Sequence, residues 1–193
     1  MAQPRTILIV GGGLEAVPGI ERVKQLGVRV VVSDGSFSAP GLRPADDRIL
    51  VSTYDIGGTV DAAANYHLRR ALDGVMSIAA DVPLTVARVA EALDLAGIPV
   101  EAAQLAADKL EMKERLARDD LPIPWFSPVE SAEHLRDIVA ERNLPLVVKP
   151  VDSRGARGVL RLTSADDIER AFSTALGVSP TLRVMAEEFL PGP

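Results

Sequence analysis

The sequence predicts an α/β fold in which an open, parallel, doubly wound sheet of the Rossmann type precedes a smaller α+β module. Short continuous apolar runs, such as residues 6–10, are typical of strands buried on both faces of a parallel sheet. Helical segments separate these runs through short turns, as in βαβ units. The alternation stops after Val100, and three prolines within residues 121–129 then require extended chain, which marks the second module.

Four strands and three helices are predicted in the first hundred residues. The first helix is indicated by Val17, Ile20 and Val23, which recur every three residues, and Gly27 ends it. The predicted strands cover residues 6–10, 28–34, 47–53 and 74–80. The predicted helices cover residues 17–26, 61–72 and 84–97, and a short extended piece follows at residues 98–100.

The second part is predicted to begin with one long helix over residues 102–120, which carries apolar side chains on or near one face. Ser131 and Ser164 are residues of the type that caps helices, and Asp167 gives Ser164 the spacing of a capping box. The remaining predicted elements are extended chain at 121–129, a helix at 131–143, strands at 145–150 and 158–162 paired as a hairpin, a helix at 165–177 and a strand at 182–190.

Composition narrows the class of protein. Apolar residues make up 47% and charged residues 25% of the chain, as in ordinary globular proteins. Cysteine is absent, which excludes disulfides and thiolate metal sites and fits a cytoplasmic protein. The net charge of −6 argues against nucleic acid as a partner. No apolar run approaches the roughly 20 residues of a membrane-spanning helix, so no membrane partner is expected.

The segment from Leu146 to Gly158 has the features of a grip for nucleotide phosphates. Burial of the apolar residues 146–148 would determine where the ammonium group of Lys149 points. The glycine-containing turn that follows offers backbone N–H groups together with the cations Arg154 and Arg157. The alternative without nucleotide binding is a surface lysine followed by a polar hairpin loop.

Glu187 and Glu188 are adjacent in the last predicted strand. Because successive side chains of a strand point to opposite faces, one of the two glutamates must face inward or into a cleft. A buried acid needs a partner, since an unpaired buried charge is costly. The sequence therefore predicts a cationic partner for one of them.

The glycines after the first strand allow a second hypothesis. Gly11 and Gly13, with Ala16, have the spacing G-x-G-x-x-A of a dinucleotide-binding turn, and Asp34 stands where a ribose-binding acid would be. A nicotinamide-dinucleotide-binding module is the alternative that these residues support. The plain explanation is that any tight βαβ turn requires glycine.

Taken together, the motifs of the second part resemble the ATP-grasp superfamily. Lys109, Lys149, the turn "DSRGARGV" and "AEEFLPG" occur in the order and spacing of that superfamily, which includes carbamoyl-phosphate synthase, biotin carboxylase and formate-dependent phosphoribosylglycinamide formyltransferase. Residues 1–104 are similar to the Rossmann-like pre-ATP-grasp domain. Residues 105–193 are similar to a linker helix and the N-terminal part of the ATP-grasp domain, with an incomplete, truncated lid module at about 145–193.

The resemblance implies a set of ATP-binding residues. Lys109 and Lys149 would bind the α- and β-phosphates, and the turn would close over the β- and γ-phosphates as a mobile lid with glycine hinges. The Glu188 carbonyl and the Leu190 N–H would bind the adenine edge, with the Glu187 carboxylate near its amino group. The implied ATP-binding residues are Lys109, Lys149, Arg154, Gly155, Ala156, Arg157, Gly158, Val159, Glu187, Glu188 and Leu190.

The implied activity of the parent protein is that of an ATP-dependent ligase, in which a carboxylate is activated as an acyl phosphate and captured by an amine or related nucleophile. Both substrates are small molecules, and a homo-oligomer is compatible with the resemblance. The acceptor is expected at the carboxyl edge of the first sheet. The candidate substrate-binding residues are Gly11, Gly13, Leu14, Glu15 and Asp81.

Magnesium accompanies ATP in this superfamily, and its acidic ligands are expected beyond residue 193. No catalytic residue and no metal ligand is therefore assigned within the sequence. Without magnesium, phosphoryl transfer loses its main electrostatic stabilisation, so these 193 residues alone are expected to be catalytically inactive. The part from about residue 145 onward is expected to be loosely ordered, and a non-catalytic partner subunit is a third hypothesis.

Overall fold

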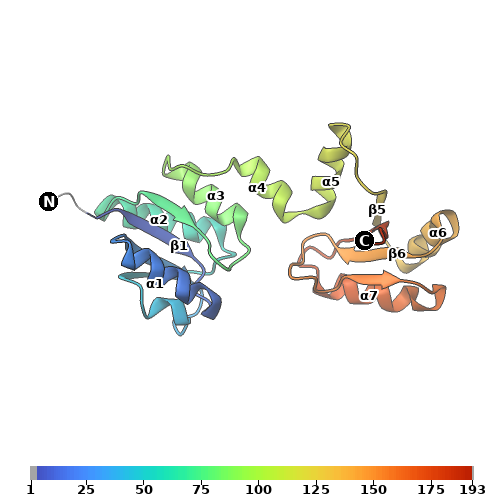
Figure 1. The fold of residues 1–193 in the computed structure, drawn as a ribbon, viewed down its shortest axis with the longest axis horizontal. Helices are drawn as coiled ribbons and strands as arrows, with labels where there is room; N and C mark the ends of the chain where they lie inside the picture. Colours follow the sequence, from blue (N-terminus) through green and yellow to red (C-terminus); the bar gives the residue numbers. More distant parts are fainter. Residues whose placement is uncertain (1–3, 193) are drawn as a thin grey trace. The chain divides into compact units, whose positions relative to one another are not determined.

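The computed structural model describes residues 4–192, and the chain divides into two compact units, Met1–Ala107 and Asp108–Pro193. Figure 1 shows a mixed α/β chain whose first unit is built on one sheet and whose second unit is built on another. No helix among the described residues is both long and apolar enough to cross a membrane.

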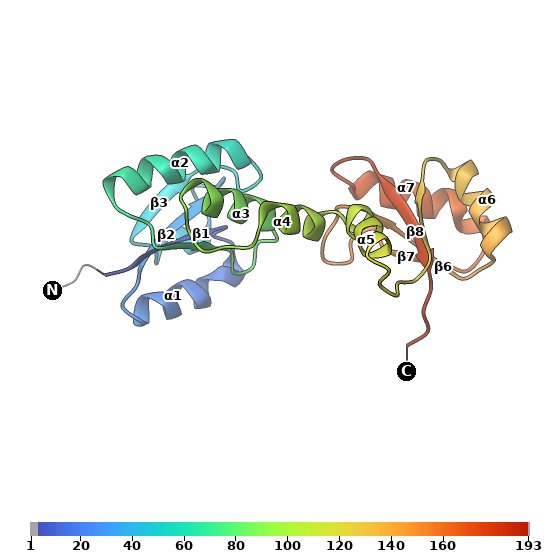
Figure 2. The ribbon, with the colours of Figure 1, turned by 90° about the horizontal axis from the view of Figure 1, so that it is seen from above.

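The first unit is a parallel, doubly wound sheet, as predicted. Its strand order is β3-β2-β1-β4, and all three strand pairs are parallel. Figure 2 shows α1 on one face of the sheet and α2 and α3 on the other. The elements are β1 (Thr6–Val10), α1 (Val17–Gln25), β2 (Arg29–Asp34), β3 (Asp47–Leu50), α2 (Ile56–Arg69), β4 (Gly74–Met76), α3 (Pro83–Ala92) and α4 (Val100–Ala107), with 3₁₀ turns at Leu14–Ala16 and Pro40–Leu42.

Two apolar layers hold this sheet between its helices. Leu8 and Val31 pack toward α2 and α3, whereas Ile9 and Val32 pack toward α1, and all four side chains are fully buried. The alternation along each strand explains why these strands are apolar without interruption.

Some boundaries in the first unit differ from the prediction. The second helix begins at Ile56, five residues before the predicted start, because the Asp55 side chain accepts a hydrogen bond from the N–H of Gly58 and caps it. The third and fourth strands end at Leu50 and Met76, before the predicted ends. Val100 opens α4 and does not extend the short piece predicted at residues 98–100.

The second unit contains a four-stranded antiparallel sheet in the order β5-β8-β6-β7. The predicted hairpin is confirmed, since β6 pairs with β7 in antiparallel register. The elements are α5 (Lys109–Arg118), β5 (Phe126–Val129), α6 (Ala132–Arg142), β6 (Leu146–Pro150), β7 (Leu160–Leu162), a 3₁₀ turn at Ala165–Asp167, α7 (Ile168–Val178) and β8 (Val184–Glu188).

One face of this sheet packs on α6 and α7. Leu146, Val148, Val184 and Ala186 are each at most 3% exposed and share one apolar core with side chains of those helices. The second unit therefore has a core of its own, built largely from residues beyond 145. The loose order expected from about residue 145 onward stays a prediction, which hydrogen exchange can test.

The long helix predicted over residues 102–120 is wrong, because the helix is interrupted at Asp108. This residue has an extended backbone, and its side chain accepts hydrogen bonds from the N–H groups of Leu110 (2.9 Å) and Glu111 (3.0 Å). Aspartate favours a helix start over a helix interior, since its carboxylate satisfies unpaired N–H groups. Asp108 and Glu111 also have the spacing of a capping box, which is the signal that could have revealed the break.

Candidate functional site

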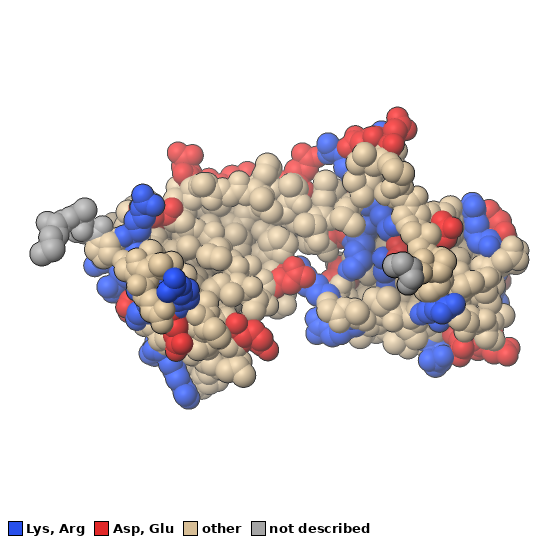
Figure 3. Space-filling view, in the orientation of Figure 1, with Lys and Arg blue, Asp and Glu red and all other residues tan. Residues whose placement is uncertain are grey.

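The face of the antiparallel sheet that does not pack on α6 and α7 carries the candidate site. Register pairs Val147 with Glu187 and Lys149 with Met185, and directly paired residues share a face, so Lys149 and Glu187 lie on this side. Leu110 of α5 packs on Met185 of this face in a small apolar cluster. In Figure 3, Lys and Arg side chains gather on the second unit below α5.

Glu187 is bound by two lysines at the centre of this face. Its Oε2 lies 3.0 Å from Nζ of Lys113, and its Oε1 accepts a short hydrogen bond from Nζ of Lys149. The three side chains are only 10–15% exposed. The prediction that one of the adjacent glutamates faces inward and has a cationic partner is thus confirmed, and Glu187 is that residue.

The ion pairs determine the protonation state of Glu187. Burial is the largest single influence and opposes ionisation, but the hydrogen bonds from Lys149 and Lys113 together outweigh it. The pKa of Glu187 therefore lies below its ordinary value, and the carboxylate is ionised at neutral pH. Two ammonium groups against one carboxylate leave the cluster with one positive charge.

Sequence reasoning missed Lys113. It is 8% exposed and reaches the same face as Lys149 from α5. The available signal was its position four residues after Lys109, since residues separated by four lie on one face of a helix. A lysine buried at that helix position requires a carboxylate as ion-pair partner, just as Glu187 requires a cationic one.

Lys109 is held against the start of the turn that follows β6. Its backbone N–H donates to the carbonyl of Val151 (2.8 Å), and its Nζ donates to the carbonyl of Ser153 (2.5 Å). The Ser153 hydroxyl in turn donates to the carbonyl of Arg157 (2.9 Å). The three lysines and the turn all belong to the second unit. Lys149 lies in β6 just before the turn, and Lys109 is hydrogen-bonded to the start of the turn.

Asp152 ties the base of this turn to the chain that enters β8. Its carboxylate accepts hydrogen bonds from the Ser179 hydroxyl (2.7 Å) and from the N–H (2.9 Å) and hydroxyl (2.5 Å) of Thr181. Burial is the largest influence on this carboxyl and opposes ionisation, but these hydrogen bonds outweigh it and lower its pKa. The turn therefore projects from an anchored base.

The two glycines of the turn have different surroundings. Gly155 (φ +63°) and Gly158 (φ +73°) both lie in the left-handed region that favours glycine. A Cβ on Gly155 would meet nothing within 4 Å, whereas a Cβ on Gly158 would lie 2.3 Å from Cγ2 of Val178. The expectation that both are free hinges with little core contact is corrected for Gly158, which packs against α7.

We expect Gly158→Ala to destabilise the second unit more than Gly155→Ala does. Both changes impose the backbone cost of about 1–2 kcal/mol for a side chain in the left-handed region. Only the first also forces a Cβ into Val178. Urea unfolding of both variants measures the difference, and equal losses would mean that the turn can move away from α7.

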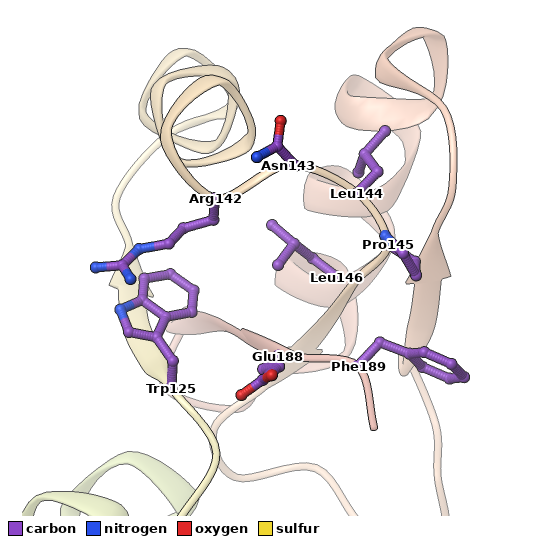
Figure 4. A pocket seen from close by; sticks show the side chains of 8 residues that line it. All are labelled: Trp125, Arg142, Asn143, Leu144, Pro145, Leu146, Glu188 and Phe189. Atoms are coloured by element: carbon purple, nitrogen blue, oxygen red, sulfur yellow. The ribbon is translucent and has the colours of Figure 1, made fainter. Parts of the chain in front are cut away.

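The side chain of Glu188 lies on the face of the sheet opposite the lysine cluster, and Leu190 lies beyond the end of the strand. Glu188 shares the opposite face of the sheet with Leu146, and its N–H donates to the carbonyl of Trp125 (2.9 Å). Glu188 lines a hollow of about 380 Å³, and Figure 4 shows it together with Trp125 and Arg142. The guanidinium of Arg142 lies 4.6 Å from the ring centroid of Trp125. Leu190 is 59% exposed and follows the end of the strand pairing at Glu188.

Most of the remaining residues of the turn are solvent-exposed. Arg157, Ala156 and Val159 are exposed, and the Nε of Arg157 donates to the carbonyl of Arg154 (3.1 Å). Ala156 also has a positive φ of +58°, so the turn holds three departures from ordinary backbone geometry, at Gly155, Ala156 and Gly158.

In the first unit, the structure brings the candidate substrate residues to the carboxyl edge of the sheet. Gly11 (φ +98°) abuts the loop that leads to Asp81, since a Cβ on Gly11 would lie 2.5 Å from Cβ of Ala80. Gly13, Leu14 and Glu15 follow directly, and Leu14 is 69% exposed. Strands β1 and β4 are neighbours, which is why these two loops meet.

The carboxylate of Asp34 has a structural role in the first unit. Its Oδ2 accepts a hydrogen bond from the N–H of Gly12 (2.8 Å), and its Oδ1 accepts one from the N–H of Ser36 (2.8 Å). The carboxylate therefore stabilises the glycine turn itself. This bonding favours the plain explanation of the motif, because a ribose would have to compete with both N–H groups for the carboxylate.

Metal binding has no support in residues 4–192, among which no group of three or more His, Asp or Glu side chains could hold an ion. In the second unit, lysine and arginine side chains carry the positive charge that could bind phosphate oxygens.

Known proteins share this fold and part of this sequence, although no family model matches the chain. The formate-dependent phosphoribosylglycinamide formyltransferase of Herminiimonas arsenicoxydans is 31% identical over 190 residues, which are 95% of this chain and 46% of that protein. The chain thus spans about half the length of this relative.

Two solved structures have the same mixed α/β fold. An L-amino acid ligase from Bacillus licheniformis superposes with a TM-score of 0.74 at 23% identity, covering 100% of this chain and 46% of that one. An N5-carboxyaminoimidazole synthetase from Staphylococcus aureus complexed with ADP gives a TM-score of 0.74 at 20% identity, covering 98% and 48%. At these identities the likeness concerns the fold alone.

Proposed function

The chain belongs to the ATP-grasp superfamily, and from that premise we propose that its second unit binds ATP within an ATP-dependent ligase. The observation that carries this proposal is the cluster of Lys113, Glu187 and Lys149 on one face of the antiparallel sheet. Its net positive charge lies in a site of low exposure, where an ammonium group interacts strongly with a phosphate. The synthetase with the same fold was solved as an ADP complex, which is consistent with a nucleotide in this fold.

Lys149 is the proposed ligand of the α- and β-phosphates. Glu187 and Lys113 are proposed to position it, because the ion pairs limit the conformations of its long side chain. Lys109 would reach the α-phosphate by exchanging its hydrogen bond to the Ser153 carbonyl for one to a phosphate oxygen. Both oxygens of Glu187 already accept from lysines, which argues for this positioning role over a contact with the adenine amino group.

The turn from Arg154 to Val159 is proposed to cover the β- and γ-phosphates. Within the described part of the chain, the N–H groups of Gly155, Ala156 and Gly158 take part in none of the turn's own backbone hydrogen bonds. Backbone N–H groups in such a turn form a concave site for anions. The Glu188 carbonyl and the Leu190 N–H remain the proposed partners of the adenine edge, since Leu190 lies beyond the strand pairing.

The proposed reaction of the parent protein is the activation of a carboxylate as an acyl phosphate, followed by capture by an amine or related nucleophile. Support comes from the formyltransferase and L-amino acid ligase that the chain resembles. The acceptor site is proposed at Gly11, Gly13, Leu14, Glu15 and Asp81, which meet at the carboxyl edge of the parallel sheet.

Titration with ATP and with NADH separates this proposal from the dinucleotide-binding alternative. We expect ATP to bind and to slow tryptic cleavage after the exposed Arg157, because a bound phosphate would order the turn. NADH is expected to do neither, since Asp34 already bonds two backbone N–H groups. Calorimetry gives both affinities, and peptide mapping identifies the cleavage site.

The outcome that would overturn the proposal is NADH binding without ATP binding, or ATP binding that leaves cleavage at Arg157 unchanged. We further propose, as the resemblance to the ATP-grasp superfamily implies, that a polypeptide of these 193 residues binds ATP without consuming it. Phosphate release at a rate typical of ATP-dependent ligases would contradict that expectation.

A further inference from the structure

A second basic site lies in the first unit, at the amino edge of its sheet. Here β2 begins at Arg29, β3 begins at Asp47, and α2 ends at Arg69. Figure 2 shows α2 beside β3. These elements surround a hollow of about 410 Å³, which we call the arginine hollow, lined by Arg29, Asp47, Arg48, Tyr66, Arg69 and Arg70. It lies at the sheet edge opposite the loops that carry Gly11 and Asp81.

The arginine hollow concentrates positive charge in an acidic protein. Four arginines and one aspartate line it, although the whole chain carries a net charge of −6. Among the described residues, the side chains of Arg48 and Arg70 have no hydrogen bond or ion pair. The one carboxylate cannot neutralise four arginines, so the lining of the hollow has a positive excess that an anion would balance.

Hydrogen bonds among Arg29, Asp47 and Tyr66 organise one side of the hollow. Asp47 Oδ2 accepts hydrogen bonds from Arg29 Nε (2.9 Å) and from the hydroxyl of Tyr66 (2.5 Å), and Tyr66 is only 8% exposed. The hydrogen bond from Arg29, then that from Tyr66, lowers the pKa of Asp47, and burial and then the bond to Asp47 raise the pKa of Tyr66. Asp47 is therefore ionised at neutral pH, and its charge is used to orient Arg29.

We propose that the arginine hollow binds the phosphate groups of a small phosphorylated molecule, independently of the ATP site proposed in the second unit. Guanidinium groups match phosphate oxygens with paired N–H donors, and several arginines together distinguish a dianion from a monoanion. A volume of about 410 Å³ falls in the range of roughly 300–1,000 Å³ for small-molecule sites. The acidic chain disfavours a polynucleotide as the source of the phosphates.

Inorganic pyrophosphate is the probe that tests this proposal, with amide NMR shifts as a readout that separates the two sites. We expect the amides of residues 47–48 and 66–70 to shift and saturate with pyrophosphate, separately from any response of residues 149–158. The double variant Arg48→Gln/Arg70→Gln should weaken the response at the hollow at least about tenfold, since it removes two charged partners of the phosphate. It should leave the response of residues 149–158 unchanged.

The matched control is Arg22→Gln/Arg43→Gln, which removes the same charge from exposed positions of the same unit outside the hollow. This pair should retain the affinity of the hollow, and the dispersed spectra show that each variant is folded. No shift at residues 47–48 and 66–70, or equal weakening by both double variants, would overturn the proposal. Tighter binding of a single-stranded oligonucleotide at the same amides would overturn the assignment to a small molecule.

Discussion

Replacing Lys149 by alanine is expected to weaken ATP binding by about 10- to 100-fold, because a charged hydrogen bond contributes about 1.5–3 kcal/mol. Lys149 faces the side of the sheet opposite the apolar core, so its removal deletes a charge at the proposed phosphate site without opening that core. Glu187 keeps its ion pair with Lys113 in this variant. The second unit should therefore remain folded, and calorimetric titration can report the change in affinity alone.

The control for this experiment is Lys24→Ala. Lys24 is also partly buried and also paired with an acid, Asp46 at 2.8 Å, but it belongs to the first unit. Its loss should leave the ATP affinity unchanged. If both variants bound ATP as the unaltered chain does, Lys149 would not be a phosphate ligand, and the nucleotide site proposed on this sheet would be refuted.

Glu187→Gln is expected to destabilise the second unit by about 2–4 kcal/mol. Removing one partner of a buried ion pair leaves the other charge uncompensated, and here two ammonium groups of 10% and 15% exposure would lose their carboxylate. The control is Glu188→Gln, an exposed residue at the end of the same strand, which should change stability by less than about 0.5 kcal/mol. Urea unfolding at neutral pH measures both.

The pH dependence of that difference is a second readout. Because the lysines hold the pKa of Glu187 below its ordinary value of 4.5, its contribution to stability is present above that pH. The contribution is lost as the pH falls through the lowered pKa of the folded state, so the gap between the unaltered chain and Glu187→Gln should close in acid. A gap that stayed constant from about pH 7 to about pH 3 would contradict this explanation.

Local patterns were sufficient for much of the fold. The apolar run of residues 6–10 could only be a strand covered on both faces, and the buried side chains of Leu8 and Ile9 confirm it. Alternation in the last strand correctly required one inward glutamate. These predictions succeeded because each depends on residues a few positions apart, whose directions follow from backbone geometry.

The missed features depend on competing local preferences or on distant neighbours. Asp108 lies inside a helical pattern, yet its carboxylate binds the N–H groups of Leu110 and Glu111 and starts a new helix. Gly158 looked like a free hinge, but α7 packs against it through Val178. Nothing near Gly158 in the sequence indicates Val178, since the contact arises only when α7 folds back on β6.

The sequence alone determined that this chain has a parallel sheet and an antiparallel hairpin whose first strand carries Lys149. It also determined that the motifs of an ATP-grasp protein follow one another in the order typical of that superfamily. Tertiary structure decided which charges meet. Lys113 and Lys149 converge on Glu187 from α5 and β6, and Arg29 of β2 meets Asp47 of β3 and Tyr66 of α2. Backbone periodicity determines which face a side chain occupies, but only the packing of separate elements brings distant charges within a few ångströms.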